Sequence, residues 1–188
     1  MKQTTKKKQL LHVGIAEKGK LYALEGEHKK ALKHYREALR MAQVNNDPEL
    51  FSQHYMQCVV ESLEISGNHD EVISYGLHVV DLIDKQEEKT LFVKKKLVSE
   101  LERLAIQYLY KGQLEEAKET LIRIKETLPQ NQPPMSRKLL DWVYRGYVIS
   151  PKQLRELQNQ YEYFIVRNDN VRKDLAIDID HILPEVSF

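Results

Sequence analysis

Apolar residues recur at three- and four-residue intervals along most of this chain, and glycines and prolines interrupt the pattern. This is the periodicity of amphipathic α-helices, each of which has one apolar face. It predicts helices over residues 10–24, 28–44, 49–65, 70–84, 89–110 and 114–127. Gly26, Gly67 and Gly112 lie in the breaks within successive pairs of helices, where a left-handed residue often ends a helix. The sequence therefore predicts an all-α fold built from helical hairpins.

The hairpins follow one another at nearly constant intervals, because the three glycines are 41 and 45 residues apart. Hairpins of one form at such intervals are typical of a helical solenoid, in which each repeat buries its apolar face against its neighbours. We expect a repeat domain over 10–131, divided into repeats 10–46, 47–88 and 89–131. A basic, flexible N-terminus over 1–9 is expected to precede it.

The first hairpin has small and aromatic residues at the positions of a known repeat. Gly19 and Tyr22 lie in its first helix, and Ala31 and Tyr35 lie in its second. At these positions the chain resembles the tetratricopeptide repeat (TPR) family, whose pattern runs W-x2-L-G-x2-Y, then A-x3-F, then proline. The third hairpin resembles the pattern at Leu101, Leu104, Ala105, Tyr108, Ala117, Leu121, Ile124 and Pro129.

The match has departures in the first and second hairpins. Ile15 replaces the tryptophan and Lys18 the leucine of the first copy, and Val72 and Gly76 stand where the second should have alanine and a large aromatic residue. The resemblance implies a right-handed helical-hairpin solenoid of about three long TPR-like repeats. It also implies that small residues let the helices of a hairpin approach closely while aromatic residues fill the space between hairpins.

The last third of the chain also has apolar stripes. We expect one helix to begin at Ser136 and another at Ser150, each serine acting as an N-cap, and a final helix over 171–183. Residues 132–188 are thus predicted to be C-terminal capping helices that close the open end of the solenoid. Two alternatives stay open: the last helix docks on a partner or on another copy, or the C-terminus fills the chain's own groove.

Charge is distributed unevenly, although the formal net charge is only +1. Residues 1–42 carry 11 basic and 4 acidic side chains (+7), whereas residues 43–91 carry 2 and 10 (−8). These blocks are either solvated helix faces or surfaces that attract an oppositely charged partner or a second copy. The sequence pI of about 7.8 argues against a nucleic-acid-binding protein, despite the basic triplets at 6–8 and 94–96.

No motif for catalysis or cofactor binding is present: there is no phosphate-binding loop, no dinucleotide fingerprint, no nucleophile elbow and no His-Glu-x-x-His. His54 and Cys58 have the spacing of two metal ligands but lack a third. A polar cluster near the C-terminus consists of Asp178, Asp180 and His181. We expect it on the solvent-exposed face of a helix. We therefore predict that the chain is not an enzyme and has neither catalytic residues, metal site nor cofactor.

The apolar runs are too short to cross a bilayer, and the basic N-terminus is not followed by a signal-peptide hydrophobic region. A single cysteine, Cys58, agrees with a reducing compartment. We therefore expect a cytoplasmic protein without a membrane span.

The family resemblance implies a concave surface, formed by the first helix of each hairpin, that binds a protein segment. Carried over to this chain, that surface includes Lys20, His54, Gln57, Glu61, Glu64, Glu102, Arg103, Ile106 and Tyr110. We do not expect the clamp by which some members of the family bind chaperone C-termini. Of the residues at its positions, only Arg103 is of the type that the clamp requires; the others are Ala16, Lys20, Cys58 and Ser99. Three glutamates, Glu61, Glu64 and Glu102, favour a partner with basic residues.

The predicted function is a non-enzymatic adaptor or scaffold that binds a protein or peptide in a TPR-like groove. One alternative is a self-assembling structural protein whose +7 end meets the −8 middle of another copy. Another is an accessory subunit or chaperone of a larger complex.

Overall fold

The computed structural model describes the backbone of residues 2–181 and the side chains of residues 11–180. Within these residues the protein is all-α, with eight α-helices and no strand, which confirms the predicted fold class. It forms two compact units, of which unit 1 comprises the chain up to Gly67 and again from Phe164, and unit 2 comprises Asn68–Tyr163. In each unit the helices pack on their neighbours along the chain, as expected for helical hairpins. The boundary at Gly67 falls inside the predicted repeat 47–88.

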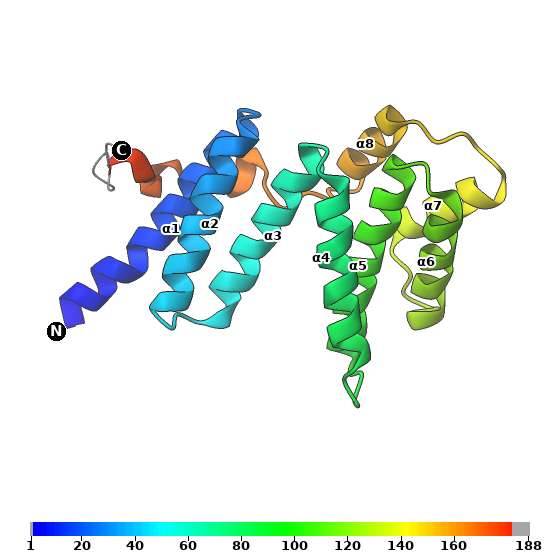
Figure 1. The fold of residues 1–188 in the computed structure, drawn as a ribbon, viewed down its shortest axis with the longest axis horizontal. Coiled ribbons are helices and arrows are strands. Elements are labelled where there is room, and N and C mark those ends of the chain that lie inside the picture. The colour runs from blue at the N-terminus through cyan, green and yellow to red at the C-terminus, as the bar shows by residue number, and fades with distance from the viewer. Residues whose placement is uncertain (1, 182–188) are drawn as a thin grey trace. The chain divides into compact units, whose positions relative to one another are not determined.

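Unit 1 contains the helices α1 (Lys2–Leu24), α2 (His28–Val44) and α3 (Glu49–Ile65), with α2 packed against both of the others (Figure 1). Two of the three have the predicted bounds. Helix α1 differs, because it begins at Lys2 instead of following a flexible segment over 1–9.

Small residues allow the close packing of unit 1. A Cβ atom on Gly19 would lie 2.7 Å from the ring of Tyr35, so the absence of a side chain lets α1 approach this aromatic residue of α2. The buried apolar residues of one core cluster are Ile15, Ala16, Ala38, Ala42, Tyr55 and Ile179. Three of the six are alanines, and one of the larger side chains, Ile179, comes from the far end of the chain.

Glycines end the first helix of each predicted hairpin. Gly26, Gly67 and Gly112 have φ values of 78°, 79° and 72°, a region that side-chain-bearing residues rarely adopt. A Cβ atom at any of them would meet nothing within 4 Å. Backbone conformation therefore requires glycine at these turns, as the sequence predicted.

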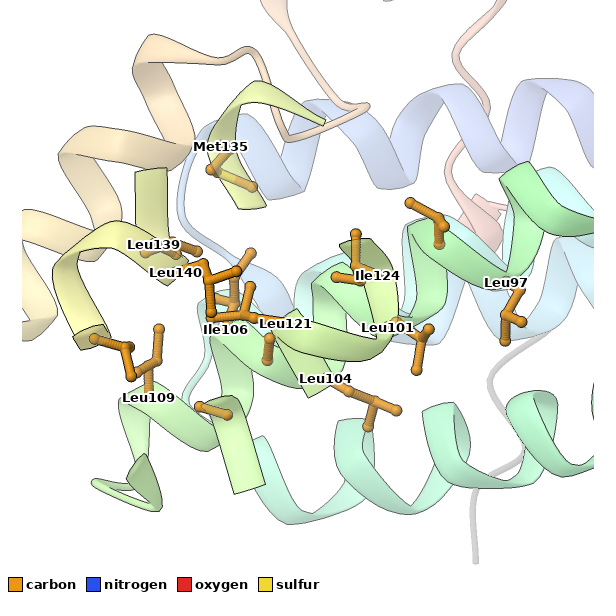
Figure 2. Packing of buried hydrophobic residues seen from close by; sticks show 14 of the residues in the cluster. Leu97, Leu101, Leu104, Ile106, Leu109, Leu121, Ile124, Met135, Leu139 and Leu140 are labelled. Atoms are coloured by element: carbon orange, nitrogen blue, oxygen red, sulfur yellow. The ribbon is translucent and has the colours of Figure 1, made fainter. Parts of the chain in front are cut away.

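Unit 2 contains α4 (His69–Asp84), α5 (Leu91–Tyr110), α6 (Leu114–Thr127), α7 (Pro134–Tyr144) and α8 (Pro151–Gln160). Its core is large and aliphatic, and Figure 2 shows leucines and isoleucines of α5, α6 and α7 meeting one another. Ser150 caps α8 as predicted, with its hydroxyl accepting the N–H of Gln153. Ser136 is not an N-cap: α7 begins at Pro134, and Ser136 lies inside the helix.

The predicted final helix over 171–183 is wrong for the residues that the structure describes. After α8 the chain forms only three short 3₁₀ turns, at Asn168–Asn170, Lys173–Leu175 and Ile179–His181, with extended segments between them. We call residues 164–180 the tail. In Figure 1 it is the orange-to-red segment, which lies along the helices of unit 1 and ends beside α1. It does not cap the end of the solenoid as a helix; Ile182 and Leu183 lie outside the described residues.

Candidate functional site

The tail is bound to unit 1 through its backbone amides. Glu61 of α3 accepts the N–H groups of Ile165 and Val166, at 2.6 and 3.1 Å. Glu17 of α1 accepts the N–H of Arg172 at 2.6 Å. Both glutamates are buried, so each of these bonds satisfies a carboxylate that would otherwise be costly to remove from water.

Gly14 is the point at which the tail comes closest to α1. The N–H of Ile177 donates to the carbonyl oxygen of Gly14 at 2.9 Å. A Cβ atom at Gly14 would lie 2.6 Å from Cδ1 of Ile177 and 2.6 Å from the carbonyl oxygen of Leu175. The second of these is a backbone atom that a rotamer change cannot move, so the docked tail requires glycine here.

Asp178 anchors the end of the tail. Its carboxylate accepts a hydrogen bond of 2.6 Å from the Tyr22 hydroxyl and lies 3.1 Å from Nε2 of His34 and 3.8 Å from Nζ of Lys18. Burial opposes its ionisation, but hydrogen bonds from Tyr22, the Asp180 N–H and His34 prevail and lower the pKa of Asp178 to about 2. The same hydrogen bond, with burial, raises the pKa of Tyr22 to about 12. Asp178 is therefore a bound anion and does not lie on the solvent-exposed face of a helix, contrary to the expectation from the sequence.

These contacts define a surface that we call the tail-binding face. It is formed by three helices of unit 1, and tail residues between Ile165 and Asp178 contact it. Beside it, Ile179 is 2% exposed and joins the core of unit 1. The residues of the tail-binding face are Gly14, Glu17, Lys18, Tyr22, His34 and Glu61.

The lowered pKa of Asp178 predicts an acid-dependent loss of stability. An ordinary aspartate has a pKa near 3.9, so the docked tail favours the charged form and contributes its full stability above about pH 4. That contribution is lost as the pH falls from 4 toward 2. We expect Asp178→Asn to lower the free energy of unfolding by about 2–3 kcal/mol at pH 6 and by less than about 1 kcal/mol at pH 2. Urea unfolding across this range measures the difference.

Asp174→Asn is the matched control for this prediction. Asp174 also lies in the tail, but its described contacts are with Arg172, two residues away, and both side chains are exposed. We expect this variant to unfold like the wild type at every pH. A gap between wild type and Asp178→Asn that stays constant from pH 6 to pH 2 would contradict the assignment of the titrating group.

Of the nine residues predicted to bind a partner, five belong to unit 1. Lys20 is buried and donates to Glu17 at 2.7 Å, and Glu61 binds the tail. Glu64 is 1% exposed, whereas Gln57 is exposed and His54 is half-buried. The structure thus places Glu61 under the chain's own tail and Lys20 beside Glu17 of the tail-binding face. Their role in binding a partner stays a prediction.

The other four residues lie on α5 in unit 2, and two of them form hydrogen bonds to other helices of this unit. Glu102 accepts hydrogen bonds from the backbone N–H and the hydroxyl of Ser136 on α7, at 3.1 and 2.5 Å. Burial raises the pKa of Glu102 even though both of these bonds oppose the shift. Tyr110 donates to Gln158 of α8 at 2.8 Å. Arg103 pairs with Glu100 at 2.9 Å, and Ile106 is fully buried in the core.

The described members of the two polar clusters noted in the sequence are not arranged as a metal site. The Sγ atom of Cys58 lies 3.9 Å from Nε2 of His54, and burial raises the pKa of the Cys58 thiol to about 12, which disfavours the thiolate that binds metals. Among the side chains of residues 11–180, no group of three His, Cys, Asp or Glu is arranged to hold a metal ion. The side chain of His181 lies outside this range.

Sequence reasoning missed most of the tail-binding face. Gly14, Glu17, Tyr22 and His34 were not among the predicted site residues. A signal for the tail was present, since Leu175, Ile177 and Ile179 alternate with other residues in the period-two pattern of an extended segment. Gly14 in the interior of a helix, where it weakens helix formation, was a second signal.

Comparisons with family models, with curated proteins and with solved structures found no match to this chain. The resemblance to TPR proteins thus remains a prediction based on the residues themselves. Among residues 2–181, no helix combines the length and the apolar character needed to cross a membrane. The function therefore has to be inferred from the geometry of the two units.

Proposed function

We propose that this chain is a non-enzymatic, cytoplasmic scaffold that binds an extended segment of a partner protein on the tail-binding face of unit 1, in the manner of TPR-like repeats. The observation that supports the proposal is the tail itself. Glu17 and Glu61 hold an extended polypeptide by its backbone N–H groups. Every residue except proline has such a group. A surface that binds one extended segment in this way has the chemistry to bind another.

The buried glutamates change the expected partner. A basic partner was predicted because Glu61, Glu64 and Glu102 are acidic, yet Glu61 bonds to backbone amides and Glu102 to a serine. On the proposed face, a partner needs free amides in an extended segment more than it needs basic side chains. The Glu61→Lys, Glu64→Lys double variant removes this backbone acceptor as well as the negative charge, so it should weaken both the tail and a partner.

An affinity pull-down from the lysate of the source cells tests the proposal, with light scattering of the pure bait. Three full-length baits are compared: wild type, Asp178→Ala, which weakens the tail without changing the tail-binding face, and the control Asp174→Ala. We expect a monomeric bait and one stoichiometric companion protein, recovered in larger amounts by Asp178→Ala only.

Two outcomes would contradict the proposal. One is the absence of a companion with all three baits, together with a homo-oligomer that dissociates between low salt and about 0.5 M salt, where charges are strongly screened. That result would favour the self-assembly hypothesis. The other is a turnover activity of the pure protein, which would refute its non-enzymatic character.

A further inference from the structure

The tail makes two kinds of contact with unit 1: backbone hydrogen bonds, which contribute affinity, and side-chain contacts, which contribute specificity. The amides of Ile165, Val166, Arg172 and Ile177 bond to Glu61, Glu17 and the Gly14 carbonyl. Such bonds can form with any extended backbone, whatever its side chains. They give an extended peptide affinity for a protein surface but no specificity. They explain why the tail is extended where the sequence predicted a helix.

The side chains of Ile177, Asp178 and Ile179 supply specificity. Ile177 lies over Gly14, where a side chain on α1 would exclude it. Asp178 is surrounded by three polar or basic groups, from Tyr22, His34 and Lys18, and Ile179 is buried. This end of the tail-binding face thus selects an aspartate between two branched apolar residues.

The rest of the tail is held by backbone hydrogen bonds more than by fully buried side chains. The side chains of Arg172, Lys173 and Asp174 are exposed. Among residues 164–180, Ile179 has the one fully buried side chain. Segments with few buried apolar contacts open at a small fraction of the free energy of global unfolding. The tail is nevertheless favoured over a free peptide, because its covalent attachment gives it an effective concentration on the order of millimolar.

From these contacts we infer that the tail is an internal ligand, and that the partner segment which displaces it is an extended peptide with an aspartate between two branched apolar residues, as in Ile177-Asp178-Ile179. The inference rests on the proposed function, since it names the class of partner for the same face. Loss of the tail exposes the buried acceptors Glu17 and Glu61, and the incoming segment satisfies them with its own amides.

The test uses a fluorescent synthetic peptide of residues 164–181 and three full-length proteins. The released variant, Asp178→Ala with Ile179→Ala, weakens the tail and leaves the tail-binding face unchanged. The control variant, Lys173→Ala with Asp174→Ala, changes two exposed tail positions. We expect the peptide to bind the released variant about 100-fold more tightly than it binds the wild type or the control, because the internal competitor is gone.

A second peptide tests the specificity. We expect the peptide with Asp178→Asn to bind the released variant at least about 10-fold more weakly, since it lacks the charge that Tyr22, His34 and Lys18 surround. Equal binding of the two peptides, or equal binding of the first peptide to the released and control variants, would overturn the inference.

A measurement on the wild-type chain avoids dependence on the folding of the released variant. Saturating unlabelled peptide should speed hydrogen exchange at the Ile177 amide of the isotope-labelled protein, because it displaces the tail; unchanged exchange would overturn the inference.

Failure of the proposed function gives a different result from failure of this inference. Peptide binding without any cellular companion refutes only the scaffold proposal, whereas a companion recovered in larger amounts by Asp178→Ala, with no peptide binding, refutes only the internal-ligand inference.

Discussion

Gly14→Ala should release the tail while leaving α1 intact. The added Cβ atom would lie 2.6 Å from the carbonyl oxygen of Leu175, and this backbone atom can move away only if the tail shifts. Overpacking of this kind typically costs about 1–3 kcal/mol, which corresponds to roughly 5- to 150-fold in the docking equilibrium of the tail. Trypsin cleavage after Arg172 and Lys173, whose side chains are exposed, measures this equilibrium. Cleavage should become faster by the same factor.

The result is informative because the substitution would otherwise stabilise the protein. Alanine in place of glycine within an exposed helix favours the helix by about 1 kcal/mol. A variant with a higher melting temperature and unchanged cleavage would therefore show that the tail does not pack on Gly14. Glu25→Ala serves as the control, since it changes an exposed position in the turn directly after the same helix and should leave cleavage unchanged.

Leu121→Ala should strongly destabilise unit 2. Leu121 of α6 is 0% exposed and lies in the cluster shown in Figure 2, among leucines and isoleucines of α5 and α7. Removal of a buried leucine side chain leaves a cavity and costs about 2–5 kcal/mol. Trp142, the only tryptophan, lies in α7 and packs against the same core, so its fluorescence reports the unfolding of unit 2 in urea.

Leu77→Ala makes the same chemical deletion at a position of α4 that is 49% exposed. The side chain is already half in water, so we expect a loss of less than about 1 kcal/mol. Equal losses at the two positions would contradict the location of the core.

The helices of this protein were predictable because their signals are local. Helices α2 and α3 begin and end where the apolar period and the breaks at Gly26, Asn45–Pro48 and Gly67 place them. The capped start of α8 at Ser150 was predictable for the same reason. Each signal involves residues within about one turn of the element that it defines.

The tail was not predictable in this way, because its conformation depends on residues more than 100 positions away. Leu175, Ile179 and Leu183 are compatible with a helical stripe, and nothing nearby indicates that the amides of Ile165 and Val166 bond to Glu61. The tertiary contacts override the local preference. The alternation at 175, 177 and 179 was the remaining evidence for an extended segment.

The candidate site was predicted only in part, for a related reason. Family resemblance indicated the inner positions of α1 and α3, and therefore included Lys20 and Glu61. It could not indicate that the occupant would be the chain's own tail. The residues that bind Asp178, namely Tyr22 and His34, become a site only when the tail is in place.

Hydrogen exchange of the full-length protein, resolved by residue with NMR, is the direct test of whether the tail is docked on unit 1. We expect the amides of Ile165, Val166, Arg172 and Ile177 to exchange at least about 10-fold more slowly than in an unstructured chain, because each is bonded to unit 1. The amides of α2 provide the reference for a folded unit. Exchange of all four at the unstructured rate while α2 stays protected, or helical chemical shifts over residues 171–181, would contradict the docking of the tail.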